Sequence, residues 1–307
     1  MDPFVAFSVF TFGLCFGSFL NVCIYRMPRG LSVSRPRSAC PNCKSMIPFY
    51  DNIPVVSWLL LRGRCRKCKT RISARYVLVE LLTAAMFLIC YRYFGLSAAF
   101  IKYATLSFLL IGLIFTDAET KLLPDKLTLT GLGLGLFFSV LVPVNDLASQ
   151  VLPGLVNLPV SSDVGWRLMS FVDASLGAMA GASFIYGAGA IYLRARGIEG
   201  MGFGDVKLMG MIGAFLGLKL TVLTIFAASI AGSIFGVSTV LAVWVRRTRR
   251  LMQRSHLSAM QARKRAWQSA QLVYRNYEMP FGVFLGSMAL LALFFGEPFL
   301  KWYWGLL

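Results

Sequence analysis

Charged residues are scarce in this sequence of 307 residues, where they make up 14% of the chain. A soluble domain carries about 25% charged residues. Hydrophobic residues make up 57% of the chain, and the mean hydropathy is +0.68. This composition excludes an ordinary soluble protein and indicates an integral membrane protein. At about 20 residues per spanning helix, the length allows about seven to nine helices and one modest lobe outside the membrane.

Histidine is almost absent, since His256 is the only one and it lies in a segment rich in arginine. Nucleophilic hydrolases need a base beside a serine or cysteine, and that base is often histidine. A Ser-His or Cys-His mechanism is therefore disfavoured. The sequence also shows no internal repeat, no low-complexity linker and no soluble second domain.

Acidic residues are few, with 13 Asp or Glu against 31 Lys or Arg, which gives a formal net charge of +18. The basic residues lie mainly between apolar segments, as the positive-inside rule predicts for loops on the cytoplasmic side. Residues 26–75 carry twelve Lys or Arg and one acidic residue, Asp51. The charge therefore indicates membrane topology and not nucleic-acid binding, and this segment is predicted to be cytoplasmic.

The apolar segments predict an all-α polytopic membrane protein with about eight transmembrane helices. Residues 1–25 are the first transmembrane helix, an anchor and not a cleaved signal peptide. Residues 26–75 are a cytoplasmic lobe, and residues 76–307 are a transmembrane bundle that includes a basic cytoplasmic segment, 246–278. The eight predicted spans are 5–25, 76–94, 98–116, 127–144, 170–193, 206–217, 220–245 and 279–304.

Cysteine is used mainly in the lobe, as two C-x2-C pairs separated by 21 residues. This spacing is typical of a four-thiolate structural zinc site, and a reducing cytoplasm disfavours disulfides. A redox or catalytic role is the remaining alternative. The predicted zinc ligands are Cys40, Cys43, Cys65 and Cys68. The other three cysteines, Cys15, Cys23 and Cys90, lie in apolar segments and are predicted to be small core residues.

Three alternating glycines, Gly200, Gly202 and Gly204, precede Asp205 at the start of an apolar segment. Glycines at this spacing allow unusual dihedrals and the close approach of an extended substrate. One alternative is a helix N-cap, for which Asp is favoured. A nucleotide-binding loop is a weaker alternative, because no strand precedes the glycines.

A second carboxylate, Asp117, ends the span 98–116, and the order of the spans puts both Asp117 and Asp205 at cytoplasmic helix ends. Two carboxyls close together in a poorly hydrated site cannot both ionise at low cost. One can then act as a general base on water while its protonated partner donates to the scissile carbonyl. The pair predicts an aspartyl protease. By contrast, Asp173 lies near the outer end of its span and is predicted to be solvated or capping.

Motifs along nearly the whole chain resemble those of bacterial type IV prepilin peptidases, which are membrane aspartyl proteases of the GxGD type. The G-x-G-D motif, the tetracysteine loop and a G-S-F-L-N start occur together and in order. The motifs are Gly17-Ser18-Phe19-Leu20-Asn21-Val22 with Arg26 and Pro28, Asp51-Asn52-Ile53-Pro54 between the cysteine pairs, Ile72-Ser73 with Arg75-Tyr76 and Glu80, Leu123-Pro124-Asp125, Gly202-Phe203-Gly204-Asp205-Val206-Lys207-Leu208, and Pro280-Phe281-Gly282.

The resemblance implies an inner-membrane endopeptidase that removes the leader of prepilins and pseudopilins on the cytoplasmic side. It implies Asp117 and Asp205 as the catalytic pair. Tetracysteine members often also methylate the new N-terminal amine with S-adenosylmethionine, so this second activity is implied as well. The expected partners are prepilin substrates and anionic lipid, with no nucleic acid, and the oligomeric state is open.

Three alternatives stand beside this hypothesis. A peptidase without methyltransferase activity would have the same motifs. An ion-coupled transporter could use intramembrane carboxylates, although transporter carboxylates lie near the membrane midplane within inverted repeats. A zinc-bearing scaffold without catalysis would leave Asp205 and its glycines without a role.

The segment 246–278 holds nine Lys or Arg and one acidic residue. Its apolar residues follow roughly helical spacing, which predicts an interfacial helix on anionic lipid beside the active site. A solvated connector that only fixes topology is the alternative. Both this segment and residues 145–167 are long for the family pattern. The predicted apolar stripe consists of Leu257, Met260, Trp267, Ala270, Tyr274 and Tyr277.

Overall fold

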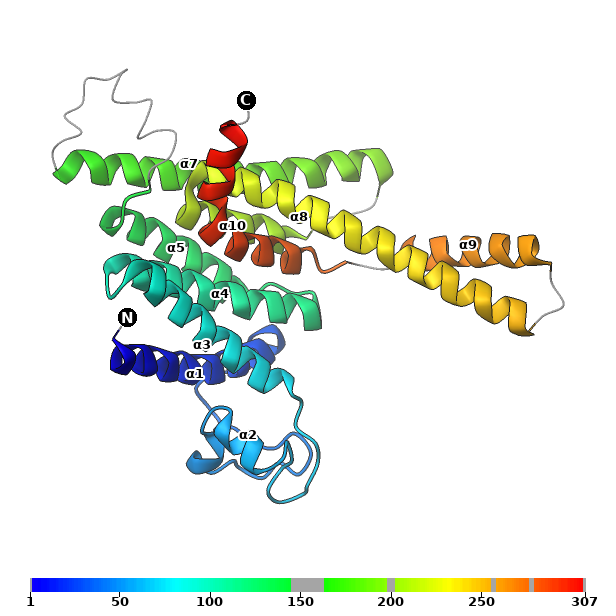
Figure 1. The fold of residues 1–307 in the computed structure, drawn as a ribbon, viewed down its shortest axis with the longest axis horizontal. Coiled ribbons are helices and arrows are strands. Elements are labelled where there is room, and N and C mark those ends of the chain that lie inside the picture. The colour runs from blue at the N-terminus through cyan, green and yellow to red at the C-terminus, as the bar shows by residue number, and fades with distance from the viewer. Residues whose placement is uncertain (1, 145–162, 198–201, 255–257, 276–278, 306–307) are drawn as a thin grey trace.

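The computed structural model describes residues 2–144, 163–197, 202–254, 258–275 and 279–305, and the chain there is built from helices (Figure 1). Those residues form no strand, only two isolated β-bridges, Ala39 with Met46 and Arg64 with Arg71. The prediction of an all-α chain is confirmed. The helices are α1 (Pro3–Arg26), η1 (Met27–Arg29), η2 (Phe49–Asn52), α2 (Val56–Leu60), α3 (Arg75–Phe94), α4 (Ala98–Thr120), α5 (Asp125–Leu141), α7 (Asp163–Arg196), α8 (Phe203–Arg254), α9 (Ala259–Arg275) and α10 (Phe281–Trp304).

Six helices of the described chain are long and apolar enough to cross a membrane, namely α1, α3, α4, α7, α8 and α10. The chain is therefore a multi-pass membrane protein. The sequence predicts eight spanning helices, and two of the predicted spans account for the lower number found here. α5 has only 17 residues, and α8 joins the predicted spans 206–217 and 220–245 in one element. Gly217 interrupts its helical dihedrals with φ of 78°, a region that glycine tolerates best, so α8 is kinked where the sequence predicts a turn.

Small residues let the helices of the bundle pack at close range. A Cβ atom on Gly13 would lie 2.6 Å from the Cα of Ala84, so α1 and α3 touch backbone to backbone. A Cβ atom on Gly177 would likewise lie 2.6 Å from the carbonyl oxygen of Gly213, where α7 meets α8. Such close contacts between membrane helices are typical of interfaces built from small residues.

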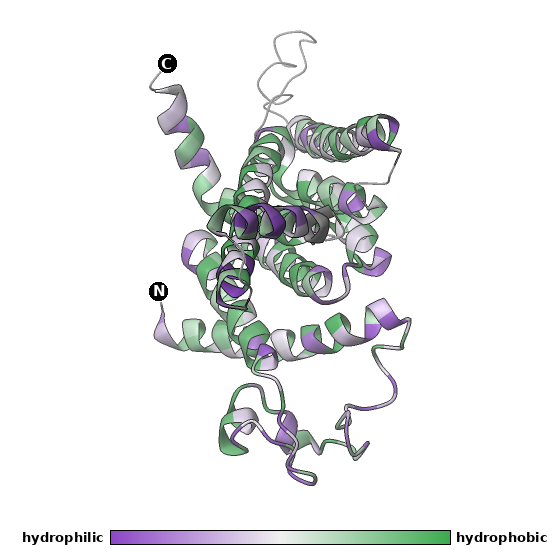
Figure 2. Ribbon diagram, turned by 90° about the vertical axis from the view of Figure 1, so that its right-hand side faces the viewer, coloured by the Kyte–Doolittle hydropathy of each residue, from purple (hydrophilic) through white to green (hydrophobic). Residues whose placement is uncertain are grey.

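The main core lies where α4, α8 and α10 meet, around buried residues such as Leu110, Met211, Phe215 and Leu285. Hydrophobic residues cover most of the helices, whereas hydrophilic residues gather at helix ends and in the lobe (Figure 2). The lobe follows α1, contains η2 and α2, and ends at α3 (Figure 1). Its short helices leave most of its backbone in turns, so its stability must come from other contacts.

α9 packs against the C-terminal part of α8, and the two form a helical hairpin that extends away from the bundle (Figure 1). The rings of Trp244 and Trp267 lie 6.1 Å apart, and the Trp244 indole N–H donates to the carbonyl oxygen of Arg263 at 3.2 Å. The buried face of α9 consists of Ala262, Ala266 and Ala270. We refer to residues 244–275 as the basic hairpin.

The predicted helix in the basic segment is thus confirmed, but the predicted apolar stripe is not its packing face. Met260 is 81% exposed. Of the stripe's side chains that the structure describes, only Ala270 is buried, because alanines allow the helix backbones to come closer than large side chains do. Leu257 and Tyr277, and the side chain of Tyr274, lie outside the described residues.

Two smaller predictions were wrong. Asp173 is fully buried and not solvated, because α7 begins ten residues before it and places it inside the helix. Cys15 is exposed on α1, whereas Cys23 and Cys90 are buried as predicted.

Candidate active site and metal centre

Asp117 lies in the last turn of α4, with a buried side chain that meets the start of α10. Its Oδ2 accepts a hydrogen bond from the backbone N–H of Val283 at 3.0 Å. Gly282 permits this approach, because a Cβ atom there would lie 2.9 Å from the same oxygen. The first N–H groups of a helix lack partners within it and favour a negative charge. The Pro280-Phe281-Gly282 motif thus brings a helix N-terminus onto Asp117.

Asp205 lies in the first turn of α8 and is 8% exposed. Its backbone N–H donates to the carbonyl oxygen of Gly202 at 3.1 Å. Because α8 begins two residues earlier, at Phe203, Asp205 is not an N-cap residue, and the N-cap hypothesis is wrong. Its carboxylate is close enough to Asp117 for an electrostatic interaction between them. The structure therefore brings the two aspartates together at neighbouring helix ends.

Leu123 fills the space between the glycines of these two helix starts. A Cβ atom on Gly204 would lie 3.0 Å from the Leu123 Cβ, and one on Gly282 would lie 3.3 Å from its Cδ1. Neither Gly202 nor Gly204 has a positive φ, so the expected unusual dihedrals are not found in the described part of the motif. Gly200 lies outside it. Position 204 is therefore occupied by glycine because Leu123 packs closely against it, and not because the backbone there is strained.

The connection from α4 to α5 closes this region from one side. α5 begins at Asp125 after Pro124, as the sequence predicts. Asp125 then forms an ion pair with Lys207 of α8 at 2.6 Å. The ion pair ties the Leu123-Pro124-Asp125 loop to the helix that carries Asp205.

Four thiols meet in the lobe, and their sulfur atoms all lie within 4.8 Å of one another. The sulfurs of Cys40 and Cys68, which belong to different C-x2-C pairs, lie 3.7 Å apart. This geometry could hold one metal ion, and four sulfur ligands are compatible with structural zinc. The four residues are those predicted, Cys40, Cys43, Cys65 and Cys68.

The two C-x2-C pairs have matching backbone turns. The N–H of Cys40 donates to the carbonyl oxygen of Ser45 at 3.0 Å, and the N–H of Cys65 donates to that of Thr70 at 2.9 Å. Lys44 and Lys69 occupy equivalent places with positive φ, 57° and 59°. Each turn directs its two sulfur atoms toward those of the other turn. The backbone conformation of both turns therefore sets the geometry of the metal site.

Hydrogen bonding favours a thiolate at one of the four cysteines, Cys68. The side chain of Thr70, hydrogen-bonded to the Cys68 sulfur at 3.3 Å, lowers the pKa of Cys68 to about 5. A metal ion binds the deprotonated sulfur, so a low thiol pKa suits a ligand. The donor set therefore fits a thiophilic dication.

Polar side chains from the membrane helices attach the lobe to the bundle. The Glu80 Oε2 of α3 accepts a hydrogen bond from the backbone N–H of Val55 at 2.8 Å. The Asn21 side-chain amide of α1 donates to the carbonyl oxygen of Tyr76 in the first turn of α3 at 2.9 Å, which joins the two helices on either side of the lobe. An ion pair also joins Arg75, at the start of α3, to Glu119, two residues after Asp117 in α4. The lobe is thus anchored beside the aspartates.

Val55 has φ of 60°, which is unusual for a β-branched residue. Such a conformation costs about 1–3 kcal/mol and persists only when its surroundings hold it. Replacing Glu80 by Ala leaves the Val55 N–H without its acceptor, so we expect a loss of about 1–3 kcal/mol of lobe stability. Limited proteolysis of residues 26–75 and the rate of metal release measure this loss.

Glu80→Gln is the matched control, because the amide oxygen can still accept from Val55. We expect this variant to behave nearly as the wild type. Equal damage in Glu80→Ala and Glu80→Gln would show that the charge, and not the hydrogen bond to Val55, matters. Sequence reasoning identifies Glu80 only as part of a motif, although an acidic residue inside an apolar span is itself the signal of a buried partner.

Two family models match the chain. "Bacterial Peptidase A24 N-terminal domain" matches residues 11–94, and "Type IV leader peptidase family" matches residues 103–237. The first match includes the cysteine cluster, and the second includes both aspartates. No solved structure shows a significant match.

Curated relatives named prepilin leader peptidase/N-methyltransferase match most of the chain. The relative from Aeromonas salmonicida is 32% identical and covers 98% of this chain and 94% of its own length. The relative from Neisseria gonorrhoeae is 35% identical, with 77% and 83% covered. The relative from Myxococcus xanthus is 36% identical, with 78% and 64% covered. Nothing in these matches supports the transporter hypothesis, and the chain belongs to the type IV leader peptidase family.

Proposed function

We propose that the protein is an aspartyl endopeptidase that removes the leader peptide from type IV prepilins or pseudopilins. Asp117 and Asp205 are its catalytic pair. The observation that carries this proposal is the meeting of two buried carboxylates from α4 and α8 in a member of a leader peptidase family. Glu80 and Asp173 are the other buried acidic residues of the described chain, and Glu80 is engaged by the Val55 N–H.

The chemistry needs only these two groups and a water molecule. One carboxylate takes a proton from water, whose oxygen attacks the scissile carbonyl, while the protonated partner donates to the carbonyl oxygen. The C–N bond then breaks, and the new amine takes up a proton. The Val283 N–H holds one Asp117 oxygen in place.

The substrate is a single apolar helix preceded by a basic leader. The protein itself carries a formal net charge of +18, so leader charge cannot supply the main attraction. Burial of the apolar helix must supply most of the binding free energy. The aspartate pair provides local negative charge where the leader joins the helix.

The bound metal is proposed to be one structural zinc ion. Cys40, Cys43, Cys65 and Cys68 would fill its tetrahedral shell and leave no position for water. Zinc would then stabilise the lobe and take no part in hydrolysis. The lobe contains only the short helices η1, η2 and α2, so it depends on such a crosslink.

The second proposed activity is methylation of the new N-terminal amine. S-adenosylmethionine would supply the methyl group, as an N–C bond forms, the C–S bond breaks and the amine loses a proton. The names of the relatives support this activity. The methyl donor is proposed to bind at the cysteine lobe, because the lobe lies outside the spanning helices and is large enough to hold it.

The protein is proposed to lie in the bacterial inner membrane with the aspartates at the cytoplasmic face. The basic lobe supports this orientation under the positive-inside rule. The Arg75–Glu119 ion pair puts the lobe and the aspartates at the same end of the bundle. The site therefore faces the compartment in which prepilin leaders are made.

The basic hairpin is proposed to lie on anionic lipid and to guide the substrate helix toward the aspartates. Each basic residue near such lipid contributes about 1 kcal/mol. Replacing the exposed residues Arg246, Arg250, Arg263 and Arg265 by Gln should raise the apparent KM for full-length prepilin in anionic vesicles severalfold. The same variant in neutral detergent is the control and should behave as the wild type. Equal effects in both media, or none in either, would make the hairpin only a connector.

The experiment that tests the proposed function uses purified protein, a synthetic prepilin peptide and an isotope-labelled methyl donor. Mass spectrometry should show a product that has lost the leader and gained one labelled methyl group. A shortened product without the label would show that the protein has peptidase activity but no methyltransferase activity. An intact peptide would contradict the proposed function.

A further inference from the structure

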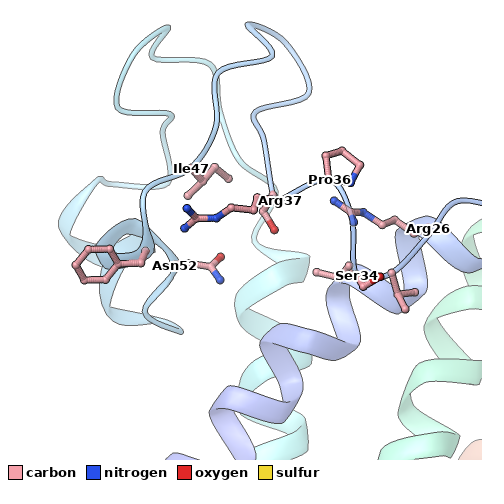
Figure 3. Close-up of a pocket in the computed structure, with 10 residues that line it drawn as sticks. Arg26, Ser34, Pro36, Arg37, Ile47 and Asn52 are labelled. Atoms are coloured by element: carbon pink, nitrogen blue, oxygen red, sulfur yellow. The ribbon is translucent and has the colours of Figure 1, made fainter.

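A cavity of about 280 Å³ lies between the end of α1 and the cysteine lobe (Figure 3). Val22 and Arg26 of α1 line it, together with Arg37 of the following loop and Asn52 of η2. Neither the aspartate pair nor the cysteine cluster is among its lining residues. Because α1 is long and apolar enough to cross a membrane, its end lies at the membrane surface. The cavity is therefore at the level of the lipid headgroups.

Two guanidinium groups line this cavity, and none of its lining residues is acidic. Arg26 donates to the carbonyl oxygen of Ser32 at 3.0 Å, and neither it nor Arg37 forms an ion pair within the described residues. The one acidic residue of the lobe, Asp51, is held by two hydrogen bonds from Arg66, at 2.6 and 2.8 Å. In Figure 3, Arg26 lies on one side of the cavity and Arg37 on the other. The cavity therefore carries positive charge without a counterion and suits an anionic group such as a phosphate.

The part of the lobe next to this cavity exposes large apolar side chains. Leu60 of α2 is 79% exposed, and Phe49 of η2, which lines the cavity, is 78% exposed. The Phe49 ring packs edge to face on that of Tyr50, which is exposed as well. Exposed hydrophobic patches mark contacts with a protein or a membrane. We refer to residues 46–60 as the apolar segment, whose exposed members include Met46, Phe49, Ile53, Val56, Leu59 and Leu60.

The apolar segment is held at the level of the spanning helices. The Val55 N–H, at the start of α2, donates to the Glu80 Oε2. Glu80 follows Arg75, the first residue of α3, by five positions, which is about 7.5 Å along the helix axis. Figures 1 and 2, which differ by a turn of 90°, both show the lobe beside α1 and not beyond its end. The exposed side chains of α2 therefore lie where lipid headgroups meet acyl chains, and not in bulk water.

One face of α1 continues from the cavity toward the middle of the membrane. Phe19, Val22 and Arg26 are spaced three and four residues apart, so they share this face. Phe12 lies on it two turns before Phe19, and both rings are exposed. The opposite face, at Gly17, packs closely against α3. An acyl chain attached to a headgroup in the cavity would therefore lie along exposed aromatic rings.

We propose that this cavity binds the phosphate of an anionic phospholipid, with the apolar segment inserted in the same leaflet. Arg26 and Arg37 donate to the phosphate oxygens, and the Asn52 amide adds a donor. The bound lipid fixes the lobe against α1. A free phosphate would satisfy the charge of the cavity but would leave the apolar segment without a contact. The proposal depends neither on the two proposed activities nor on the basic hairpin.

A second cavity of about 550 Å³ is also basic, with Arg62, Arg64 and Arg71 in its lining. None of its lining residues belongs to a spanning helix. Its aromatic residue, Trp58, is engaged, because the indole N–H donates to the carbonyl oxygen of Ile72 at 3.2 Å. The two cavities share their charge, but only the first continues onto a helix that can carry acyl chains. The second cavity therefore provides an internal comparison.

The test uses the full chain with its zinc in vesicles of phosphatidylethanolamine and phosphatidylglycerol. Phosphatidylglycerol with a photoreactive group beside its phosphate should label residues 22–37, and the same lipid with that group in an acyl chain should label residues 49–60. Peptide mass spectrometry locates each label. Native mass spectrometry in neutral detergent should show phosphatidylglycerol bound about tenfold to a hundredfold more weakly in Arg26→Gln and in Arg37→Gln.

Lys67→Gln is the matched control, because Lys67 is an exposed basic residue of the lobe that lines neither cavity. It should bind phosphatidylglycerol as the wild type does. Zinc content and circular dichroism verify that each variant is folded, and the labelling of the wild type needs no variant.

Headgroup label within residues 58–74 would assign the lipid to the second cavity and overturn the proposal. Equal weakening in Lys67→Gln would show that net charge, and not this cavity, attracts the lipid. Inorganic phosphate that bound as tightly as phosphatidylglycerol would make the cavity a site for free phosphate. Acyl-chain label absent from residues 49–60 would show that the apolar segment faces water or another protein, which would also overturn the proposal.

Discussion

Asp117→Asn and Asp205→Asn are each expected to reduce leader cleavage by at least about 10³-fold. An amide cannot take the proton from water or return one to the carbonyl, so either substitution removes one half of the acid-base pair. The change keeps the size of each side chain, and in Asp117→Asn the new amide oxygen could still accept from the Val283 N–H. We therefore expect both variants to insert, fold and retain the metal.

Asp125→Asn is the matched control for this experiment. Asp125 lies in the same region and pairs with Lys207, but its side chain is 60% exposed. An exposed ion pair contributes only about 0–1 kcal/mol, so cleavage should stay near the wild-type rate. Initial rates on a prepilin peptide, measured by mass spectrometry, separate the buried pair from this exposed acid. A loss in Asp125→Asn as large as in the other two would point to a general effect of charge.

Replacing Cys40, Cys43, Cys65 and Cys68 by Ser together is expected to remove zinc completely and unfold the lobe. Structural zinc contributes about 10–16 kcal/mol of binding free energy, and the lobe has little other regular structure to replace it. Metal analysis of protein purified without chelator should give one zinc ion per wild-type chain and none in the variant. Residues 26–75 should then become sensitive to protease.

Loss of zinc should damage methylation more than cleavage, because the aspartates lie on the membrane helices whereas the lobe is proposed to hold the methyl donor. Cys15→Ser is the control, since Cys15 is exposed on α1 and away from the cluster. It should keep its zinc. Zinc retained after loss of all four lobe cysteines would contradict the assignment of the ligands.

The main parts of the site could be predicted from the sequence because each has a local signal. A carboxylate at the end of an apolar segment is costly without a role, which singled out Asp117 and Asp205. The C-x2-C spacing singled out the four cysteines. The alternating glycines marked close approach, although the structure attributes Gly204 to packing against Leu123 and not to strain.

Other parts depend on contacts between distant residues, which no local pattern reveals. The Glu80 hydrogen bond to Val55 joins residues 25 apart, and it exists only because α3 meets the lobe there. The packing face of the basic hairpin was mistaken because apolar periodicity favoured the large side chains, whereas the alanines give the closer contact. Helix boundaries are also hard to predict from a local pattern. α7 begins earlier than predicted, and Asp173 is therefore inside the helix and buried.

The most direct test of the central claim is a double-mutant cycle on the two aspartates. Leader cleavage by the wild type, by Asp117→Asn, by Asp205→Asn and by the double variant would be measured on zinc-loaded protein in one vesicle preparation. If the carboxylates act as one unit, each single variant loses about as much activity as the double variant. Substantial cleavage by either single variant, or losses that multiply in the double variant, would contradict a catalytic pair.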